Sequence, residues 1–97
     1  MIIVARVSFP KKNLSQAVKA YTSLKLLPVD IERGGPYFKT NEGEIEAITY
    51  YRFLPEAPSD PLKYVKERYE SFETIKGFSG EIARWQSIDE AITRLTT

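Results

Sequence analysis

The side chains in this sequence that could do chemistry are arginines, a tyrosine and a carboxylate, placed along two segments of alternating polarity. Arg6 lies in the first segment, and Glu46, Tyr50 and Arg52 lie in the second. Arginine can hold a carboxylate through two parallel hydrogen bonds, so Arg6 and Arg52 could bind an acidic ligand. Tyr50 could stack on an aromatic ligand or donate a hydrogen bond to it. Glu46 could act as a general base if burial raised its affinity for a proton.

The chain has no histidine and no cysteine. This removes the commonest general base and metal ligand, and it excludes disulfides and thiolate nucleophiles. No nucleophile with an adjacent base is visible in the sequence. We therefore expect no metal site and no cofactor, and the balance favours a protein without catalytic activity of its own.

Size and composition indicate a single domain over residues 1–97. Such a chain buries roughly 60–65% of its unfolded surface, and 42% hydrophobic with 28% charged residues is ordinary for a globular protein. A net charge of +1 gives no field that would attract nucleic acid or an anionic membrane. Arg6 interrupts the apolar start before a signal segment could form, and no stretch approaches the ~18 apolar residues of a membrane helix. We expect a cytoplasmic protein without a membrane partner.

Hydrophobic periodicity predicts the elements that position these side chains. Six segments carry a strand or helix period, in the order strand, helix, strand, strand, helix, strand: Ile2–Phe9, Leu14–Leu27, Val29–Lys39, Ile45–Phe53, Leu62–Ile75 and Gly80–Gln86. This βαββαβ order predicts the α+β class, as a ferredoxin-like sandwich with a four-stranded antiparallel sheet and two helices on one face. A capping box over 87–90 predicts a short C-terminal helix with Ala91, Ile92 and Leu95 facing inward.

The two strands predicted at the centre of the sheet each have one apolar face. Ile3, Ala5, Val7 and Phe9 alternate on the first strand, and Ile45, Ala47, Thr49, Tyr51 and Phe53 alternate on the other. The first helix carries its own apolar stripe, which we expect to be buried: Leu14, Ala17, Val18, Tyr21 and Leu24. The Gly34-Gly35-Pro36 break predicts a bulged edge strand.

The second face of these strands is mixed, and two interpretations of it remain open. It carries Arg6, Tyr50 and Arg52, and Arg84 joins them if the last strand has the same parity. In one interpretation, Arg6–Glu46 or Arg52–Glu44 form cross-strand ion pairs on a solvated surface. In the other, a second subunit covers the face and encloses a ligand cavity, which the Ile, Val and Tyr residues there favour.

Trp85 and the arginines bear on the same question. We expect Trp85 in the core under the second helix rather than as a stacking platform in a pocket. Four of the six arginines fall in predicted strands, whereas seven of the eight lysines lie in helices or loops. Arginine tolerates partial burial better than lysine does, so this division is typical of strands with a partly covered face.

Two segments, Met1-Ile2-Ile3-Val4-Ala5-Arg6-Val7 and the stretch from Gly77-Phe78-Ser79-Gly80 through Trp85 to Ser87, resemble the dimeric α+β barrel superfamily. That superfamily holds the antibiotic-biosynthesis monooxygenase-like proteins. The resemblance implies two ferredoxin-like subunits that pack their open sheet faces into a barrel, with a ligand cavity in each. It supplies no catalytic residue, because the Asn of cofactor-independent oxygenases and the His of several relatives have no match here.

Three functions follow in order of preference. The first is a homodimeric binding or accessory domain for a small acidic or aromatic ligand, held by Arg6, Tyr50, Arg52 and Arg84. The alternative is a cofactor-independent enzyme on a small metabolite, monooxygenase- or isomerase-like, with Glu46 as its base. The third is an RNA-binding module, since RNA-recognition motifs share this topology. The near-neutral charge disfavours nucleic acid, and the tail helix could also close the open face within one chain.

Overall fold

The computed structural model describes residues 1–55, 57 and 60–96. Its strands and α-helices follow in the order β1 Ile2–Pro10, α1 Leu14–Thr22, β2 Ile31–Asn41, β3 Glu44–Phe53, α2 Pro61–Arg68, β4 Ser79–Trp85 and α3 Ile88–Thr96, with short 3-10 turns at Lys11–Asn13 and Glu70–Thr74. The strands form one antiparallel sheet in the order β2-β3-β1-β4. The predicted α+β chain with a four-stranded antiparallel sheet is confirmed.

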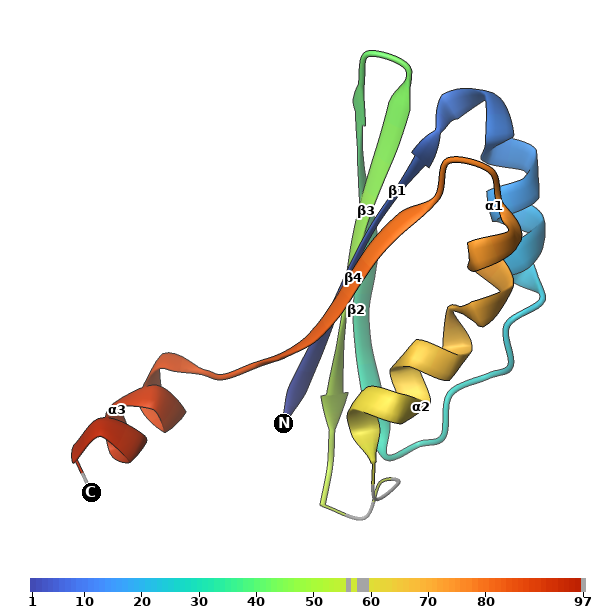
Figure 1. Ribbon diagram of the computed structural model, residues 1–97. Coiled ribbons are helices and arrows are strands. Elements are labelled where there is room, and N and C mark those ends of the chain that lie inside the picture. The colour runs from blue at the N-terminus through green and yellow to red at the C-terminus, as the bar shows by residue number, and fades with distance from the viewer. Residues whose placement is uncertain (56, 58–59, 97) are drawn as a thin grey trace.

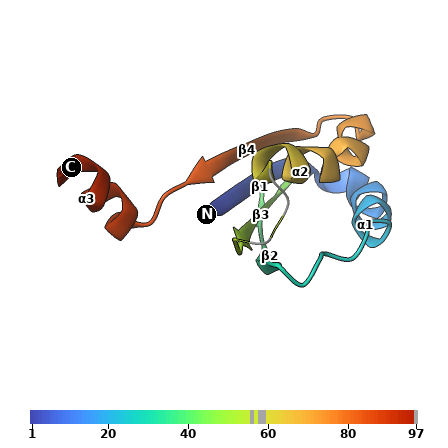
Figure 2. The same ribbon diagram turned by 90° about the horizontal axis from the view of Figure 1, so that it is seen from below.

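The core lies between this sheet and the helices α1 and α2, which sit on the same side of it (Figures 1 and 2). The alternating apolar residues of β1 and β3 all face that side and are buried, as predicted. Ile3 on β1 and Val65 on α2 are completely buried. In the described part of the chain, no helix covers the opposite side of the sheet (Figure 1); we call this side the open face.

Helix α2 begins and ends for local reasons. Asp60 accepts a hydrogen bond from the backbone N–H of Lys63 at 3.1 Å, and Pro61 occupies the first turn. The predicted helix over Leu62–Ile75 is divided, because α2 stops at Arg68 and a 3-10 turn continues the chain. Gly77 then adopts a φ of +83°, the left-handed conformation of a helix-terminating glycine.

Helix α1 stands away from the sheet more than its sequence suggests. Only Ala17 of its apolar stripe is buried, whereas Leu14, Val18 and Tyr21 are exposed. An apolar groove of about 120 Å³ separates this helix from β2 and β3. The expectation of a fully buried stripe is therefore wrong for most of its members.

Helix α3 projects from the end of β4 and has no substantial packing against any other described element (Figures 1 and 2). The predicted cap is present, since the Glu90 N–H donates to the Ser87 hydroxyl at 3.1 Å. The predicted inward orientation is wrong within this chain, because Ile92 and Leu95 are exposed. The radius of gyration is 14.9 Å, against ~12.5 Å for a compact chain of this length. No helix among the described residues has the length and apolarity to cross a membrane.

Candidate functional site

The open face collects the polar and aromatic side chains that the core excludes. Strand pairing places the following residues on it: Ile2, Val4, Arg6 and Ser8 of β1, Glu46, Ile48, Tyr50 and Arg52 of β3, Tyr37 of β2, and Glu81, Ala83 and Trp85 of β4. Three of the four predicted ligand-binding residues, Arg6, Tyr50 and Arg52, therefore share this face. It is the surface on which a ligand or a partner would meet them.

A hollow of about 660 Å³ lies in the open face and has Arg6 in its lining. Arg6 stands in register between Ile48 on β3 and Glu81 on β4, and Tyr37 also lines the hollow. Within residues 1–55, 57 and 60–96, no carboxylate lies within ion-pair distance of the Arg6 guanidinium. The hollow thus combines an available cation with aromatic and aliphatic surface.

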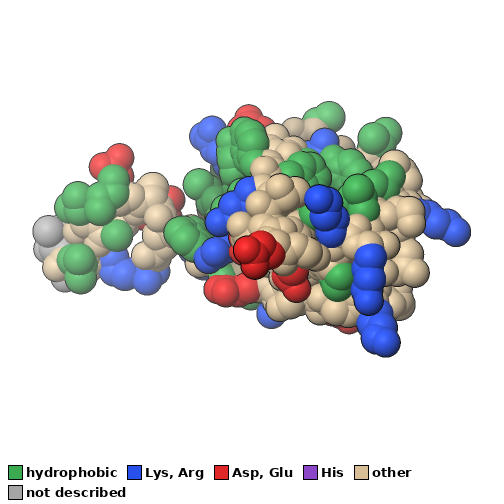
Figure 3. Space-filling model, turned by 90° about the horizontal axis from the view of Figure 1, so that it is seen from above, with side chains coloured by type: hydrophobic (Ala, Val, Ile, Leu, Met, Phe, Trp, Pro, Cys, Tyr) green, Lys and Arg blue, Asp and Glu red, His purple; other side chains and the backbone are tan. Residues whose placement is uncertain are grey.

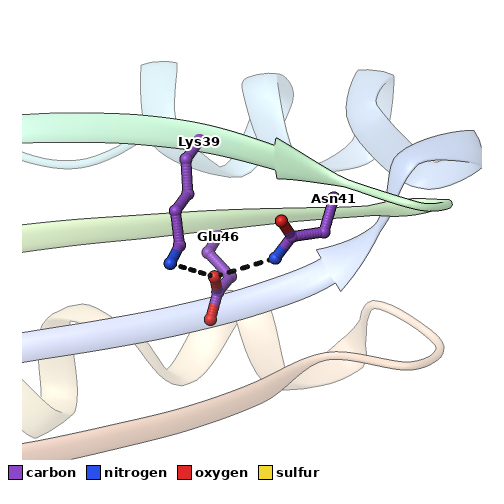
Figure 4. A network of polar contacts seen from close by, with 3 residues as sticks. All are labelled: Lys39, Asn41 and Glu46. Carbon is purple, nitrogen blue, oxygen red and sulfur yellow. Dashed lines mark hydrogen bonds and ion pairs between the residues drawn. The ribbon is translucent and has the colours of Figure 1, made fainter.

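Glu46, the predicted general base, is bound within its own sheet. Its carboxylate forms an ion pair with the Lys39 ammonium at 3.1 Å and accepts a hydrogen bond from the Asn41 side chain at 3.1 Å (Figure 4). The predicted Arg6–Glu46 pair is therefore replaced by a pair between β2 and β3. The carboxylate remains partly exposed, so a single chain does not give it the burial that a general base of this kind needs.

Arg52 also has a different partner from the predicted Glu44. Its guanidinium lies 3.4 Å from the Glu32 carboxylate, across the β2–β3 pairing, and both side chains are more than half exposed. Exposed pairs of this kind contribute little stability. Arg52 is thus on the open face but already engaged, unlike Arg6.

The Tyr50 ring lies across the edge strand β2, over Gly34. A Cβ atom at Gly34 would overlap the Tyr50 ring, so the absence of a side chain there makes room for the tyrosine. Gly34 also opens the bulge, because the β2–β3 register shifts between Gly34 and Tyr37. The predicted bulge is confirmed, and it fixes where Tyr50 and Tyr37 stand relative to each other.

The last strand settles the placement of Arg84 and Trp85. Trp85 pairs with Ile2 and Arg84 with Ile3, so Trp85 lies on the open face and Arg84 has the opposite parity. Trp85 is 52% exposed, and the expectation that it belongs to the core is wrong. Arg84 therefore does not share the open face with Arg6, Tyr50 and Arg52, and of those three only Arg6 lines the hollow.

Sequence reasoning missed three residues of the hollow: Tyr37, Lys39 and Glu81. Tyr37 and Lys39 alternate with Phe38 along β2, which is a usable signal. The bulge hides their parity, however, because it changes which residues of β2 face those of β3. Among the described residues, no three carboxylates gather as a metal site would require.

A separate polar pair is buried on the helix side of the sheet. The hydroxyl groups of Tyr51 and Tyr69 lie 2.8 Å apart, and both side chains are buried. Burial raises the pKa of the Tyr69 hydroxyl above its ordinary value, and the neighbouring Tyr51 raises it further. Buried hydroxyls need partners, so this pair is a structural element of the core rather than part of the open face.

Comparison of the chain with protein-family models, with curated proteins and with solved structures finds no match.

Proposed function

We propose that this chain is a ferredoxin-like domain that forms a homodimer through its open face and binds a small acidic or aromatic ligand between the two sheets. The observation that carries the proposal is the hollow around Arg6. There an arginine without an ion pair among the described residues stands beside the exposed apolar surfaces of Tyr37 and Ile48. The strand order β2-β3-β1-β4, with α1 and α2 on one side, supports the ferredoxin-like assignment.

The apolar content of the open face supports its being covered. Ile48 and Tyr50 on β3, Tyr37 on the neighbouring β2 and Trp85 on β4 are each 41–59% exposed on this face. A sheet face that is exposed to solvent in the functional protein normally carries polar residues. Contiguous exposed apolar patches mark interaction sites. Two open faces packed against each other would remove these side chains from water together.

The chemistry of Arg6 supports an anionic ligand. Covering the face would take the Arg6 guanidinium out of water, which is costly unless a carboxylate or other acceptor meets it. Glu81 stands opposite in register but does not pair with it. A hollow of about 660 Å³ lies within the size range of small-molecule sites, and Tyr37 offers a ring against which an aromatic acid would stack.

The proposal agrees with the resemblance to the dimeric α+β barrel superfamily, in which two ferredoxin-like sheets pack face to face. Each protomer would contribute its Arg6, and the two hollows would open into the space between the sheets. In this arrangement the ligand is bound at the interface, so dimerisation and binding are coupled.

A cofactor-independent enzyme acting on the same ligand is the second candidate. The position of Glu46 in the hollow favours it, since a carboxylate beside a bound acid or phenol is placed to move a proton. Its pairing with Lys39 and Asn41 keeps this candidate second. RNA binding stays third: Tyr50 and Trp85 could stack bases, but Glu46 and Glu81 would face the phosphates.

The dimer is tested by light scattering after size exclusion on matched variants. We expect a mass of twice 11.1 kDa for the wild type and of one chain for Ile48→Glu. Val18→Glu is the control, because Val18 is a similarly exposed aliphatic residue (51% against 41%) on the helix side. It should remain dimeric. A monomeric wild type, or an Ile48→Glu variant that stays dimeric, would contradict an interface on the open face.

The ligand is tested by calorimetric titration with benzoate and 4-hydroxybenzoate as probes. Arg6→Met should weaken binding by roughly 10- to 100-fold, the loss of one charge-assisted hydrogen-bonded contact, while the dimer persists. Arg84→Met serves as the matched arginine control and should bind as the wild type does. Equal affinity in the wild type and Arg6→Met, or no binding of either probe by the wild type at millimolar concentration, would refute the ligand assignment.

A further inference from the structure

Helix α3 is amphipathic, and its apolar stripe is exposed in the part of the chain that the structure describes. Ile88, Ile92 and Leu95 form one stripe and are 72%, 51% and 85% exposed. Glu90 and Thr93 lie on the opposite side of the helix. A helix of nine residues is not stable in water by itself, so a stripe of this kind requires a partner surface. Figure 3 shows the hydrophobic side chains of α3 in a lobe separate from the body of the molecule.

A second hollow offers the complementary surface. It has a volume of about 390 Å³ and lies between the segment that follows α1 and the start of β2. Its lining includes three apolar side chains and three cations: Leu24, Leu26, Leu27, Lys25, Arg33 and Arg68. We call it the basic hollow. Leu26 is 95% exposed, and the described lining contains no carboxylate.

Arg68 adds an unsatisfied donor to the basic hollow. Its Nη1 donates to the Lys25 carbonyl oxygen at 2.7 Å. Its Nε is buried and has no hydrogen-bond partner among the described residues. Together with Arg33, this guanidinium makes the hollow suited to an apolar element that also carries a carboxylate.

The start of α3 cannot reach the basic hollow of its own chain. Three residue steps separate Trp85 from Ile88, which is a span of about 10 Å at most. The basic hollow borders β2, and β2 is three strand spacings from β4, or about 14 Å. The basic hollow is also on the helix side, whereas α3 extends toward the side of the open face (Figures 1 and 2).

A partner subunit brings the basic hollow within reach. Trp85, Ile2, Arg52 and Glu32 form one row across the sheet, so the end of β4 and the start of β2 are level. When two sheets pack face to face about a two-fold axis along the strands, β4 of one protomer lies over β2 of its partner. The sheets are then about 10 Å apart, so the residues between Trp85 and Ile88 reach the level of the partner's edge strand β2. The nine residues of α3, which span about 13 Å, extend past that edge to the helix side, where the basic hollow lies.

We infer that α3 of each protomer docks into the basic hollow of the other protomer, so that the two chains exchange their C-terminal helices. Ile88, Ile92 and Leu95 pack on the leucines of the hollow, with Ile92 facing Leu26. Asp89, which flanks the apolar stripe, meets Arg33 and Arg68. The inference rests on the proposed homodimer, and it specifies a second contact that joins the same two chains outside the sheet interface.

Cysteine cross-linking in the full chain tests the exchange, and the lack of native cysteine makes every disulfide unambiguous. The variants Leu26→Cys and Ile92→Cys are prepared separately, mixed, allowed to exchange subunits and oxidised. A disulfide needs Cα atoms within about 7 Å, so we expect a covalent dimer of the two variants on a non-reducing gel. The control mixture pairs Leu26→Cys with Thr93→Cys, which lies on the opposite side of α3. It should give at least several-fold less covalent dimer.

Each outcome decides between the exchange and its alternatives. A cross-linked dimer only in the first mixture supports the exchange. Equal cross-linking in both mixtures, or none in a protein that is dimeric by light scattering, overturns the exchange and leaves the proposed dimer standing. A monomeric protein whose Leu26→Cys/Ile92→Cys double variant forms a disulfide within one chain overturns both. As a second measurement, Asp89→Lys should raise the dimer dissociation constant roughly tenfold, and Arg33→Glu in the same chain should restore part of the loss.

Discussion

Removing one hydroxyl of the buried tyrosine pair tests how the core is held together. Tyr51→Phe deletes a hydrogen bond of 2.8 Å and leaves the Tyr69 hydroxyl without that partner, in a site where both side chains are buried. A lost hydrogen bond costs about 1 kcal/mol net, and a buried group left unsatisfied costs about 1–3 kcal/mol. The buried Thr49 still interacts with Tyr69, so we expect a loss of about 1–2 kcal/mol in the free energy of unfolding.

The double variant makes this reasoning refutable. Tyr51→Phe/Tyr69→Phe removes both hydroxyls, so no donor is stranded, and its loss should be about 1 kcal/mol smaller than the sum of the two single losses. The assay is urea unfolding followed by far-ultraviolet circular dichroism, at one fixed protein concentration because dimerisation contributes to stability. Additive losses, or single variants as stable as the wild type, would show that the hydroxyl pair is not a coupled interaction.

The same pair predicts how stability changes at high pH. Burial raises the pKa of Tyr69 in the folded state, so the folded chain holds this proton more tightly than the unfolded chain does. That stabilisation is complete below the unfolded pKa of about 10 and is lost as the pH rises above it. We expect the urea concentration at the unfolding midpoint to decrease as the pH is raised from about 9.5 to 11. In Tyr69→Phe this decrease should be smaller. An unchanged slope in the variant would contradict the assignment.

Two further predictions concern glycines. Gly34→Ala should displace the Tyr50 ring, because the added Cβ overlaps it. Since the ring is the free end of a side chain, we expect weaker benzoate binding with only a small change in the free energy of unfolding. Equal affinity for benzoate would show that Tyr50 is not part of the ligand site. Gly77→Ala should cost roughly 1–2 kcal/mol for its φ of +83° and more for a Cβ placed 2.5 Å from Pro10 Cγ, whereas Gly43→Ala shares the positive φ and meets nothing within 4 Å. Equal losses at the two positions in urea unfolding would exclude the Pro10 contact as a cause.

The sequence predicts the central strands well, because each of them has one face against the core. Ile3 and Ala5 on β1, and the alternating residues of β3, are buried as their period-2 pattern indicates. The edge strand β4 has no such pattern: Ile82 and Ala83 are adjacent and both half-buried. Its parity is set by pairing with β1. The size and apolarity of Trp85 predict a core position, but this pairing puts the residue on the open face.

The ion pairs and the outer helices depend on information that one local segment does not hold. Lys39 meets Glu46 only because the bulge shifts the register of β2, and no local pattern specifies the size of that shift. The stripe of α3 is a correct prediction of amphipathicity, but its direction depends on what the helix packs against. The period-2 pattern of β1 correctly predicts that Arg6 lies on the open face, but the availability of its guanidinium depends on where the neighbouring carboxylates lie in three dimensions, as the pairing of Glu46 with Lys39 shows.

The position of Trp85 makes the chain's own fluorescence a sensor of assembly. It is the single tryptophan of the protein, it is half-exposed on the open face, and only Gln86 and Ser87 separate it from α3. Because the core holds tyrosines and phenylalanines but no indole, unfolding of a monomer changes the surroundings of Trp85 little. Association through the open face would bury the ring and shift its emission to shorter wavelength. Diluting the native protein should therefore shift the tryptophan emission to longer wavelength at concentrations where the circular dichroism of the backbone is still that of the folded chain.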